Sequence, residues 1–262
     1  MPTWKLEIEY EGTRYRGWQM QHNAKSIQGE FMDAARQLFS ERVDLFGAEA
    51  TDAGVHALRQ VAHLRAGELK TDLTPRMVQH GFNDILPHDI NIIKVTNAPD
   101  AFHARNDAVE RRYLYQISTR RTAFGKNLVW WIKDRLDPRA MNEAAQMLAG
   151  KHDFRSFAEM EDAKRQSTIV EIKHAGVFTD GDLICFRIGA PYFLPKMVRR
   201  IVGMLAEVGR GELSYDGFER LLKFGSDVPA KFTAPPSGLF LESVLFAGEK
   251  RPPEARSLLT VS

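Results

Sequence analysis

The sequence predicts an α+β fold built from two ferredoxin-like halves, each with the order βαββαβ. Three observations support this prediction. Hydrophobic periods of strands and helices follow one another in that order, the order occurs twice, and no proline- or serine-rich linker separates the two copies. We expect the sheets of the two halves to join around a central basic cleft.

The first half begins with a strand, because Trp4, Leu6, Ile8 and Tyr10 alternate with polar residues. Ser26 is a suitable N-cap for a helix whose apolar residues follow helical spacing as far as Leu38. The remaining strands of this half are expected at 43–46, 60–64 and 90–95, with a short helix from Pro75 toward Phe82.

The second half repeats the order with additions. Its first strand carries Tyr113, Tyr115 and Ile117 on one face, and Asp137-Pro138 begins a helix that Gly150 ends. Further strands are expected at 128–132, 169–178, 183–188 and 239–246, and further helices at 197–209 and 218–222. We therefore expect an N-terminal domain at 1–100, a second domain at 101–247 and a polar tail at 248–262.

The composition excludes several classes of protein. The chain has 262 residues, of which 44% are hydrophobic and 27% charged, values that are typical of globular proteins rather than disordered or fibrous ones. A single cysteine, Cys185, excludes an intrachain disulfide and a cysteine-based zinc site. The amino terminus lacks the apolar core of a signal peptide, and no apolar stretch is long enough to span a membrane. We expect a soluble, cytoplasmic protein.

Asp52 is the most distinctive candidate for a functional residue. It lies in the run Ala50-Thr51-Asp52-Ala53-Gly54, whose small residues allow a tight turn and the close approach of another molecule. This setting suits a nucleophile at the floor of a cleft. An Asx-turn, in which the carboxylate bonds its own backbone, is the alternative that the segment alone favours.

Cations gather locally although 36 Lys and Arg against 34 Asp and Glu leave a net charge of only +2. Arg111-Arg112 precede Tyr113, which places phosphate-binding groups beside a ring that can stack on a base. Tyrosines at alternate positions are also ordinary strand packing. The other two clusters are Lys196 with Arg199 and Arg200 at a helix start, and Arg14 with Arg16 and Trp18 in a loop. The alternatives are a solvated helix end for Arg200 and, for the loop, a surface loop with one ring folded onto the core.

Common cofactor motifs are missing. The sequence contains no GxGxxG, no GxxxxGK[ST] and no GxSxG, so it offers no standard nucleotide-binding loop or serine nucleophile. His56 and His63 flank the Asp52 loop, but no third ligand lies at a suitable spacing, which makes a metal site improbable. We expect no cofactor and no metal.

Motifs along most of the chain, taken in order, resemble those of the TruA-type tRNA pseudouridine synthase family. The first group comprises Tyr10-Glu11-Gly12, Tyr15-Arg16-Gly17-Trp18-Gln19, Ser26-Ile27-Gln28, Thr51-Asp52-Ala53-Gly54-Val55-His56-Ala57, Gln60-Val61-Ala62-His63, Leu86-Pro87-His88-Asp89-Ile90 and Phe102-His103-Ala104-Arg105. The second comprises Arg111-Arg112-Tyr113-Leu114-Tyr115, Gly150-Lys151-His152-Asp153-Phe154-Arg155-Ser156-Phe157, Met197-Val198-Arg199-Arg200-Ile201-Val202-Gly203, Glu207-Val208-Gly209-Arg210-Gly211 and Ala234-Pro235-Pro236-Ser237-Gly238-Leu239.

The resemblance implies a reaction that converts uridine to pseudouridine in the anticodon stem and loop of tRNA. This isomerisation is redox-neutral and calls for no metal, nucleotide or flavin. By the family pattern Asp52 is the nucleophile, Tyr113 stacks on the extracted base, and Arg199 lies near Asp52 and keeps it ionised. Contacts to tRNA phosphates are then expected from Arg111, Arg112, Lys196, Arg14 and Trp18. The resemblance also implies a homodimer.

The chain departs from the family pattern directly before Thr51-Asp52. The family places Gly-Arg there and uses the arginine to hold the base out of the helix, whereas this chain has Glu49-Ala50. Our hypothesis is that Arg59, seven residues after Asp52, partly replaces that arginine. The main alternative function is a catalytically weakened member that binds or folds tRNA, and an unrelated metabolic enzyme on the same scaffold is a more distant one.

Overall fold

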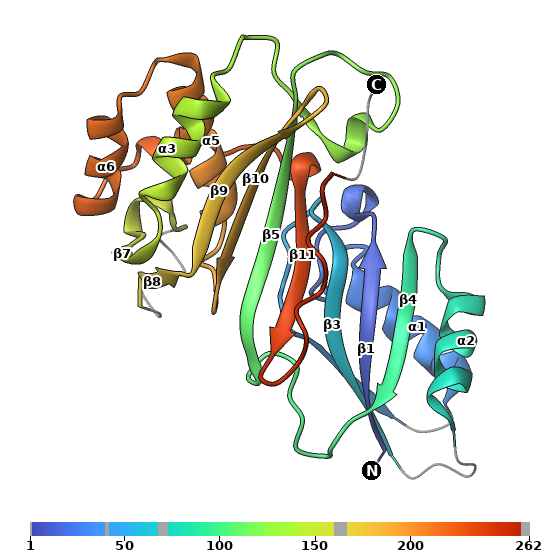
Figure 1. Cartoon of the computed structure of the whole chain (residues 1–262). Coiled ribbons are helices and arrows are strands. Elements are labelled where there is room, and N and C mark those ends of the chain that lie inside the picture. The colour runs from blue at the N-terminus through green and yellow to red at the C-terminus, as the bar shows by residue number, and fades with distance from the viewer. Residues whose placement is uncertain (1, 40–41, 68–72, 160–166, 258–262) are drawn as a thin grey trace. The chain divides into compact units, whose positions relative to one another are not determined.

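The computed structural model describes residues 2–39, 42–67, 73–159 and 167–257. The chain forms two compact units, and Figure 1 shows their strands and helices. Unit 1 consists of residues 1–109 with 241–251, and unit 2 of residues 110–240 with 252–262. The predicted α+β class is confirmed.

Unit 1 has the predicted βαββαβ order. Strand β1 lies between β3 and β4 and is antiparallel to both, β2 pairs with the other edge of β3, and β11 follows β3 in the sheet order. The elements are β1 (Thr3–Tyr10), η1 (Gly12–Arg14), α1 (Ile27–Leu38), β2 (Val43–Gly47), β3 (His56–Ala66), α2 (Pro75–Ile85) and β4 (Ile90–Asn97), with β11 (Leu239–Phe246) near the carboxyl end.

The core of unit 1 lies between its sheet and the helices α1 and α2, which Figure 1 shows on one side of the strands. The alternate residues of β1 predicted to point inward are buried. Ser26 caps α1 as predicted, since its hydroxyl accepts a hydrogen bond from the Gly29 amide at 3.2 Å. Phe31 joins the two helices because its ring centroid lies 5.6 Å from that of Phe82 on α2.

In unit 2, β10 lies between β5 and β9 and is antiparallel to both, while the short β6 pairs with β5 in parallel. The order β5-α3-β9-β10-α5-β11 keeps the predicted sequence of elements, with others added. The elements are β5 (Ala108–Ser118), η2 (Lys126–Leu128), β6 (Trp130–Trp131), α3 (Pro138–Gln146), β7 (Gly150–Asp153), η3 (Arg155–Phe157), β8 (Ile169–Ile172), β9 (His174–Asp180), β10 (Leu183–Ala190), α5 (Met197–Arg210), α6 (Tyr215–Lys223), α7 (Val228–Lys231) and η4 (Pro236–Gly238).

Two strands expected in the second half differ in the structure. The strand expected at 169–178 is divided at Lys173, because β8 leaves the main sheet and pairs with β7, a polar strand that hydrophobic periodicity does not indicate. The strand expected at 128–132 shortens to Trp130–Trp131, since Gly125 adopts a left-handed conformation (φ 65°) and starts a 3-10 turn before it. The expected polar tail has no helix or strand at 250–257, and residues 258–262 lie outside the described residues.

The described part of the chain contains no helix with the length and apolar character needed to cross a membrane.

Phe31 provides a test of this core. Replacing Phe31 by Ala should lower the free energy of unfolding by about 3–4 kcal/mol, because the fully buried ring leaves a cavity between α1 and α2. The half-exposed Met77 on α2 serves as the control, and Met77→Ala should change stability by less than about 0.5 kcal/mol. Urea denaturation of both variants measures the difference. Equal stabilities would contradict this assignment of the core.

Candidate functional site

Asp52 is the first residue of a tight turn. The Val55 amide donates a hydrogen bond to the Asp52 carbonyl at 3.1 Å, and Gly54 at the third position has a φ of 76°. Such a positive φ is favourable for glycine and strained for other residues. The turn is therefore closed by a backbone hydrogen bond, and the glycine at its third position makes its conformation favourable.

The segment from Gly12 to Trp18 holds this turn in place. The Trp18 amide donates to the Thr51 carbonyl at 3.0 Å, and the Gly54 amide donates to the Tyr15 carbonyl at 3.1 Å. These two hydrogen bonds bracket Asp52, so the backbone on either side of the carboxylate is fixed to a second segment of the same unit.

Two glycines make this close approach possible. A Cβ atom on Gly12 would lie 1.9 Å from the Val55 carbonyl oxygen, and one on Gly17 would lie 2.5 Å from the Thr51 carbonyl oxygen. Gly17 also has a φ of 94°, which other residues rarely adopt. The Gly12 amide donates to Nδ1 of His56 at 2.9 Å, which adds a side-chain contact between the two segments.

Buried polar side chains support the segment between the end of β2 and the turn. The hydroxyls of Tyr10 and Thr51 are hydrogen-bonded at 2.7 Å, and Gln60 donates from Nε2 to the Glu49 carbonyl at 2.8 Å. Burial raises the pKa of Tyr10, so its hydroxyl stays neutral at physiological pH. Gln60 is fully buried and was not among the predicted site residues. The only indication of its role in the sequence is that a single polar amide side chain begins an apolar run.

His56 and His63 do not form a metal site. Nδ1 of His56 accepts a hydrogen bond from Gly12, and Nδ1 of His63 accepts one from the Ala104 amide at 3.1 Å. In a neutral ring the other nitrogen then carries the proton, which leaves no lone pair for a metal. Burial lowers the pKa of His63 to about 4, so this ring is neutral at physiological pH.

The predicted site residues Arg14 and Trp18 occupy different environments. Arg14 has an exposed side chain and donates from Nε to the Asp89 carboxylate at 3.0 Å, while the Tyr15 hydroxyl donates to the other oxygen of Asp89 at 2.6 Å. Trp18 is only 2% exposed and packs near Phe31. Its ring belongs to the core, the alternative weighed for this loop, and is not presented to a nucleotide.

Arg59 lies on β3 with its Nε 3.6 Å from the Glu7 carboxylate on β1. Successive residues of a strand point to opposite faces, so Arg59 and the neighbouring Gln60, which supports Glu49, lie on opposite sides of the sheet. That Arg59 replaces the arginine missing at position 50 stays a hypothesis. To do so, Arg59 would have to leave its ion pair with Glu7.

In unit 2, strand periodicity separates the predicted pair Arg111-Arg112. Arg111 shares one face of β5 with Tyr113, and Arg112 points to the other face. The Arg111 guanidinium donates to the Pro191 carbonyl at 2.6 Å, and the Tyr113 ring meets the Phe193 ring edge to face at 5.2 Å. Arg111 and Tyr113 therefore both contact the 191–193 segment.

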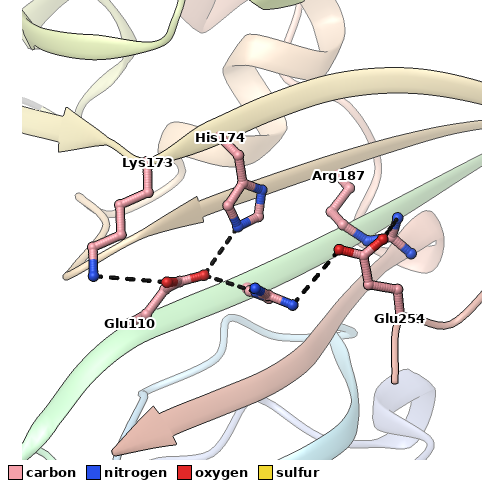
Figure 2. Close-up of polar contacts among 6 residues, drawn as sticks. Glu110, Lys173, His174, Arg187 and Glu254 are labelled. Carbon is pink, nitrogen blue, oxygen red and sulfur yellow. Dashed lines mark hydrogen bonds and ion pairs between the residues drawn. The ribbon is translucent and has the colours of Figure 1, made fainter. Parts of the chain in front are cut away.

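Arg112 belongs to a buried ion-pair network, drawn in Figure 2. Its Nε donates to the Glu110 carboxylate at 2.7 Å, and its Nη1 lies 3.8 Å from the Glu254 carboxylate. The Arg112 and Glu110 side chains are only 3% and 2% exposed. The remaining contacts are His174 to Glu110 at 2.9 Å, Lys173 to Glu110 at 3.6 Å and Arg187 to Glu254 at 3.2 Å.

This network gives Arg112 a structural role in place of the expected phosphate contact. Two carboxylates already neutralise its guanidinium, and Glu254 links the chain after β11 to β5 and β10. Glu110 was not predicted, because an acid next to two arginines in a strand has no distinctive pattern.

Three cations lie at the start of α5, as predicted. Lys196 is the N-cap in a left-handed conformation (φ 60°) and its ammonium forms an ion pair with Glu159. Arg199 donates from Nε to the Ala234 carbonyl at 2.8 Å. Arg200 is buried and donates to the Ala158 carbonyl, so the solvated helix end considered for it is wrong. Burial lowers the pKa of its guanidinium.

The chain matches known enzymes over most of its length. A family model described as tRNA pseudouridine synthase matches residues 144–247. Proteins named tRNA pseudouridine synthase A are similar along almost their whole length. One from Rhodopseudomonas palustris (strain BisA53) is 42% identical over 93% of this chain and 99% of its own, and one from Dictyoglomus thermophilum is 37% identical over 92% and 98%. The chain belongs to the tRNA pseudouridine synthase A family.

Glu110 makes a testable contribution to stability. Glu110→Gln should lower the free energy of unfolding at neutral pH by about 3 kcal/mol, because it leaves the buried Arg112 without its main counter-charge. Burial raises the pKa of Glu110, but hydrogen bonds and positive charge from Arg112 and His174 lower it more, so it lies below the ordinary value of 4.5. A depressed pKa means that the stabilisation is present above that value and is lost as the pH falls through the folded-state pKa.

Urea denaturation across this pH range measures the difference between the wild type and Glu110→Gln. The difference should shrink below pH 4.5. The exposed Glu212 is the matched control, and Glu212→Gln should have little effect at any of these pH values. A difference between Glu110→Gln and wild type that is independent of pH would contradict the network.

Proposed function

We propose that this protein is a tRNA pseudouridine synthase that isomerises uridine in the anticodon stem and loop of tRNA, with Asp52 as the nucleophile. The observation that carries the proposal is the Asp52 turn, whose backbone is held on both sides by hydrogen bonds to the 12–18 segment. A carboxylate whose flanking backbone is held by a second segment is preorganised, which suits a nucleophile. The relatives named tRNA pseudouridine synthase A support the substrate class.

The reaction breaks the bond between C1′ of the ribose and N1 of uracil, and forms one between C1′ and C5. A carboxylate can hold one half of the substrate covalently while the uracil turns, which divides a difficult exchange into two steps. The proton on C5 is then lost and N1 gains one, so the overall change is neutral in charge and in redox state. The residue that removes the C5 proton is unassigned, and Tyr113 is a candidate.

The family motifs supply the other proposed roles. Tyr113 stacks on the uracil after it leaves the RNA stack, a step that costs a few kcal/mol. Arg199 supplies the positive charge that keeps the Asp52 carboxylate ionised. Arg111, Lys196 and Arg14 contact phosphates, each by exchanging a present partner for RNA: the Pro191 carbonyl, Glu159 and Asp89 respectively. We also propose a homodimer located in the cytoplasm.

Glu49-Ala50 favours one second candidate function, a tRNA-binding module with weak activity. Loss of a charged hydrogen-bonding group commonly costs about 1.5–3 kcal/mol, or about ten- to a hundredfold in rate or affinity. Ala50 is exposed next to the turn, and the Glu49 backbone is bonded through both its amide and its carbonyl to Gln60. The backbone conformation is thus held without an arginine, and the missing element is the donor that would hold the base.

Asp52→Ala tests the proposed reaction. Unmodified tRNA transcripts incubated with the wild type should acquire pseudouridine in the anticodon arm, and Asp52→Ala should form none because no group can attack C1′. Asp33 on α1 is an exposed acid paired with Arg36, so Asp33→Ala is a matched loss of one carboxylate and should keep activity within about twofold. Chemical mapping of pseudouridine gives the positions.

Other outcomes separate the two candidates. Salt-dependent binding of tRNA by the wild type without product would favour the binding module. Product formation by Asp52→Ala at the rate of the wild type would contradict the proposed nucleophile.

A further inference from the structure

One segment of unit 2 carries positive charge and aromatic rings without any acid. Residues 119–133, named here the 119–133 segment, contain no Asp or Glu, although the whole chain has nearly equal numbers of acids and bases. Its cations are Arg120, Arg121, Lys126 and Lys133, and its aromatic residues are Phe124, Trp130 and Trp131. None of them belongs to the site described above.

Two of these rings are exposed. The Phe124 side chain is 86% exposed, more than any other large hydrophobic residue in the described part of the chain, and Trp131 is 43% exposed. The Arg121 guanidinium lies 5.9 Å from the centre of the Trp131 ring. An exposed phenylalanine costs solubility, and the arginine placed over the Trp131 ring adds a second aromatic site with positive charge to the same segment.

The segment is held in a defined conformation by bonds within unit 2. The Thr122 hydroxyl accepts from the Phe124 amide at 3.2 Å and donates to the Phe124 carbonyl at 2.9 Å, which fixes the backbone on both sides of the ring. Gln116 and Ser237 donate to the carbonyls of Leu128 and Val129 at 3.0 Å. Phe124 is therefore presented to solvent by a preorganised loop, which lowers the entropic cost of binding a ligand.

The positive charge of the segment is largely uncompensated. Arg120 forms an ion pair with Asp182 at 2.8 Å. Within the described ranges, Arg121, Lys126 and Lys133 have no acidic side chain within ion-pair distance. The surface thus combines exposed rings with three such cations, which suits a polyanion that also offers flat bases.

The segment is continuous with the surroundings of Arg199. The Trp130 ring meets the Tyr115 ring edge to face at 6.3 Å, and the Tyr115 hydroxyl donates to the Pro235 carbonyl at 2.7 Å. The adjacent carbonyl, that of Ala234, accepts from Arg199. These contacts join the 119–133 segment to the part of unit 2 that holds Arg199.

We propose that the 119–133 segment is a docking platform for RNA, on which Phe124 stacks against an unpaired base while Arg121 and Lys126 bind the neighbouring phosphates. The proposal rests on the proposed function, because it takes tRNA as the ligand. A protein partner suits the segment less well, since charged residues are depleted from the cores of protein interfaces, whereas cations interleaved with aromatics are typical of single-stranded RNA sites.

Substitution of Phe124 tests the platform by binding alone. Phe124→Ala should raise the Kd for an unmodified tRNA transcript about tenfold, since stacking of one base on an aromatic ring is worth about 1–3 kcal/mol. Arg121→Gln should also weaken binding, and should lower the slope of log Kd against log salt by about 0.7 if it removes one phosphate contact. Filter binding or fluorescence anisotropy at several salt concentrations measures both.

A second exposed pair of the same kind provides the control. On α6 the Arg220 guanidinium also lies 5.9 Å from the centre of an exposed ring, Phe224, which is 63% exposed, but this helix contains the acids Asp216 and Glu219. Phe224→Ala and Arg220→Gln should leave the Kd within about twofold of the wild type. Equal effects of the Phe124 and Phe224 substitutions would overturn the platform.

Two further results have distinct meanings. If Phe124→Ala changes the oligomeric mass in solution while the affinity for tRNA is unchanged, the segment binds a second copy of the chain and the proposal is wrong. If the wild type binds tRNA and modifies it but Phe124→Ala binds equally well, only the platform fails. Pseudouridine formation that persists in Asp52→Ala would instead contradict the proposed nucleophile and leave the binding result standing.

Discussion

The close approach of two backbone segments in unit 1 is the constraint on which the candidate site depends. The segment 12–18 can reach the Asp52 turn only because Gly12 and Gly17 have no Cβ atoms, and the hydrogen bonds of Trp18 and Gly54 then fix the turn from both sides. Beneath it, the buried Tyr10 and Gln60 are hydrogen-bonded to Thr51 and Glu49, which lie between β2 and the turn. The turn is thus anchored to the core of unit 1. Trp18 connects the two, because its amide bonds to Thr51 and its ring is buried in that core.

In unit 2, the two faces of strand β5 make different contacts. On β5, Arg111 and Tyr113 face the 191–193 segment, while Glu110 and Arg112 face the network that holds β9, β10 and the chain after β11. Adjacent arginines therefore have different partners, since Arg111 donates to the Pro191 carbonyl and Arg112 is fixed by buried charge. The 119–133 segment, proposed above to bind RNA, follows directly after the end of β5.

The sequence predicted the elements well where a period or a cap determined them. Ser26, Pro75 and Asp137 lie at the starts of helices as expected, and the strand 239–246 has the predicted ends. Long-range pairing was less predictable, because β8 leaves its sheet to pair with a polar strand whose sequence has no alternation. Asp52 and the glycines near it could be selected by residue type alone. Gln60 and Glu110 could not, because each has a partner that is distant in the sequence, Tyr10 for Gln60 and His174 for Glu110. Trp18 and Arg112 looked like ligand-binding residues because burial cannot be read from a loop or from an adjacent pair of cations.

The turnover rate of Gly17→Ala at saturating tRNA tests most directly the claim that the held turn makes Asp52 effective. A Cβ atom at position 17 would collide with the backbone of Thr51 and Asp52, so the substitution should displace both residues. We expect kcat to fall by about tenfold or more, since small misplacements of reacting groups have large effects on rate. Gly81→Ala on α2 is the control, because a Cβ there meets only the flexible end of Leu38. With both proteins shown to be folded by circular dichroism, a kcat for Gly17→Ala within about twofold of the wild type would contradict the account.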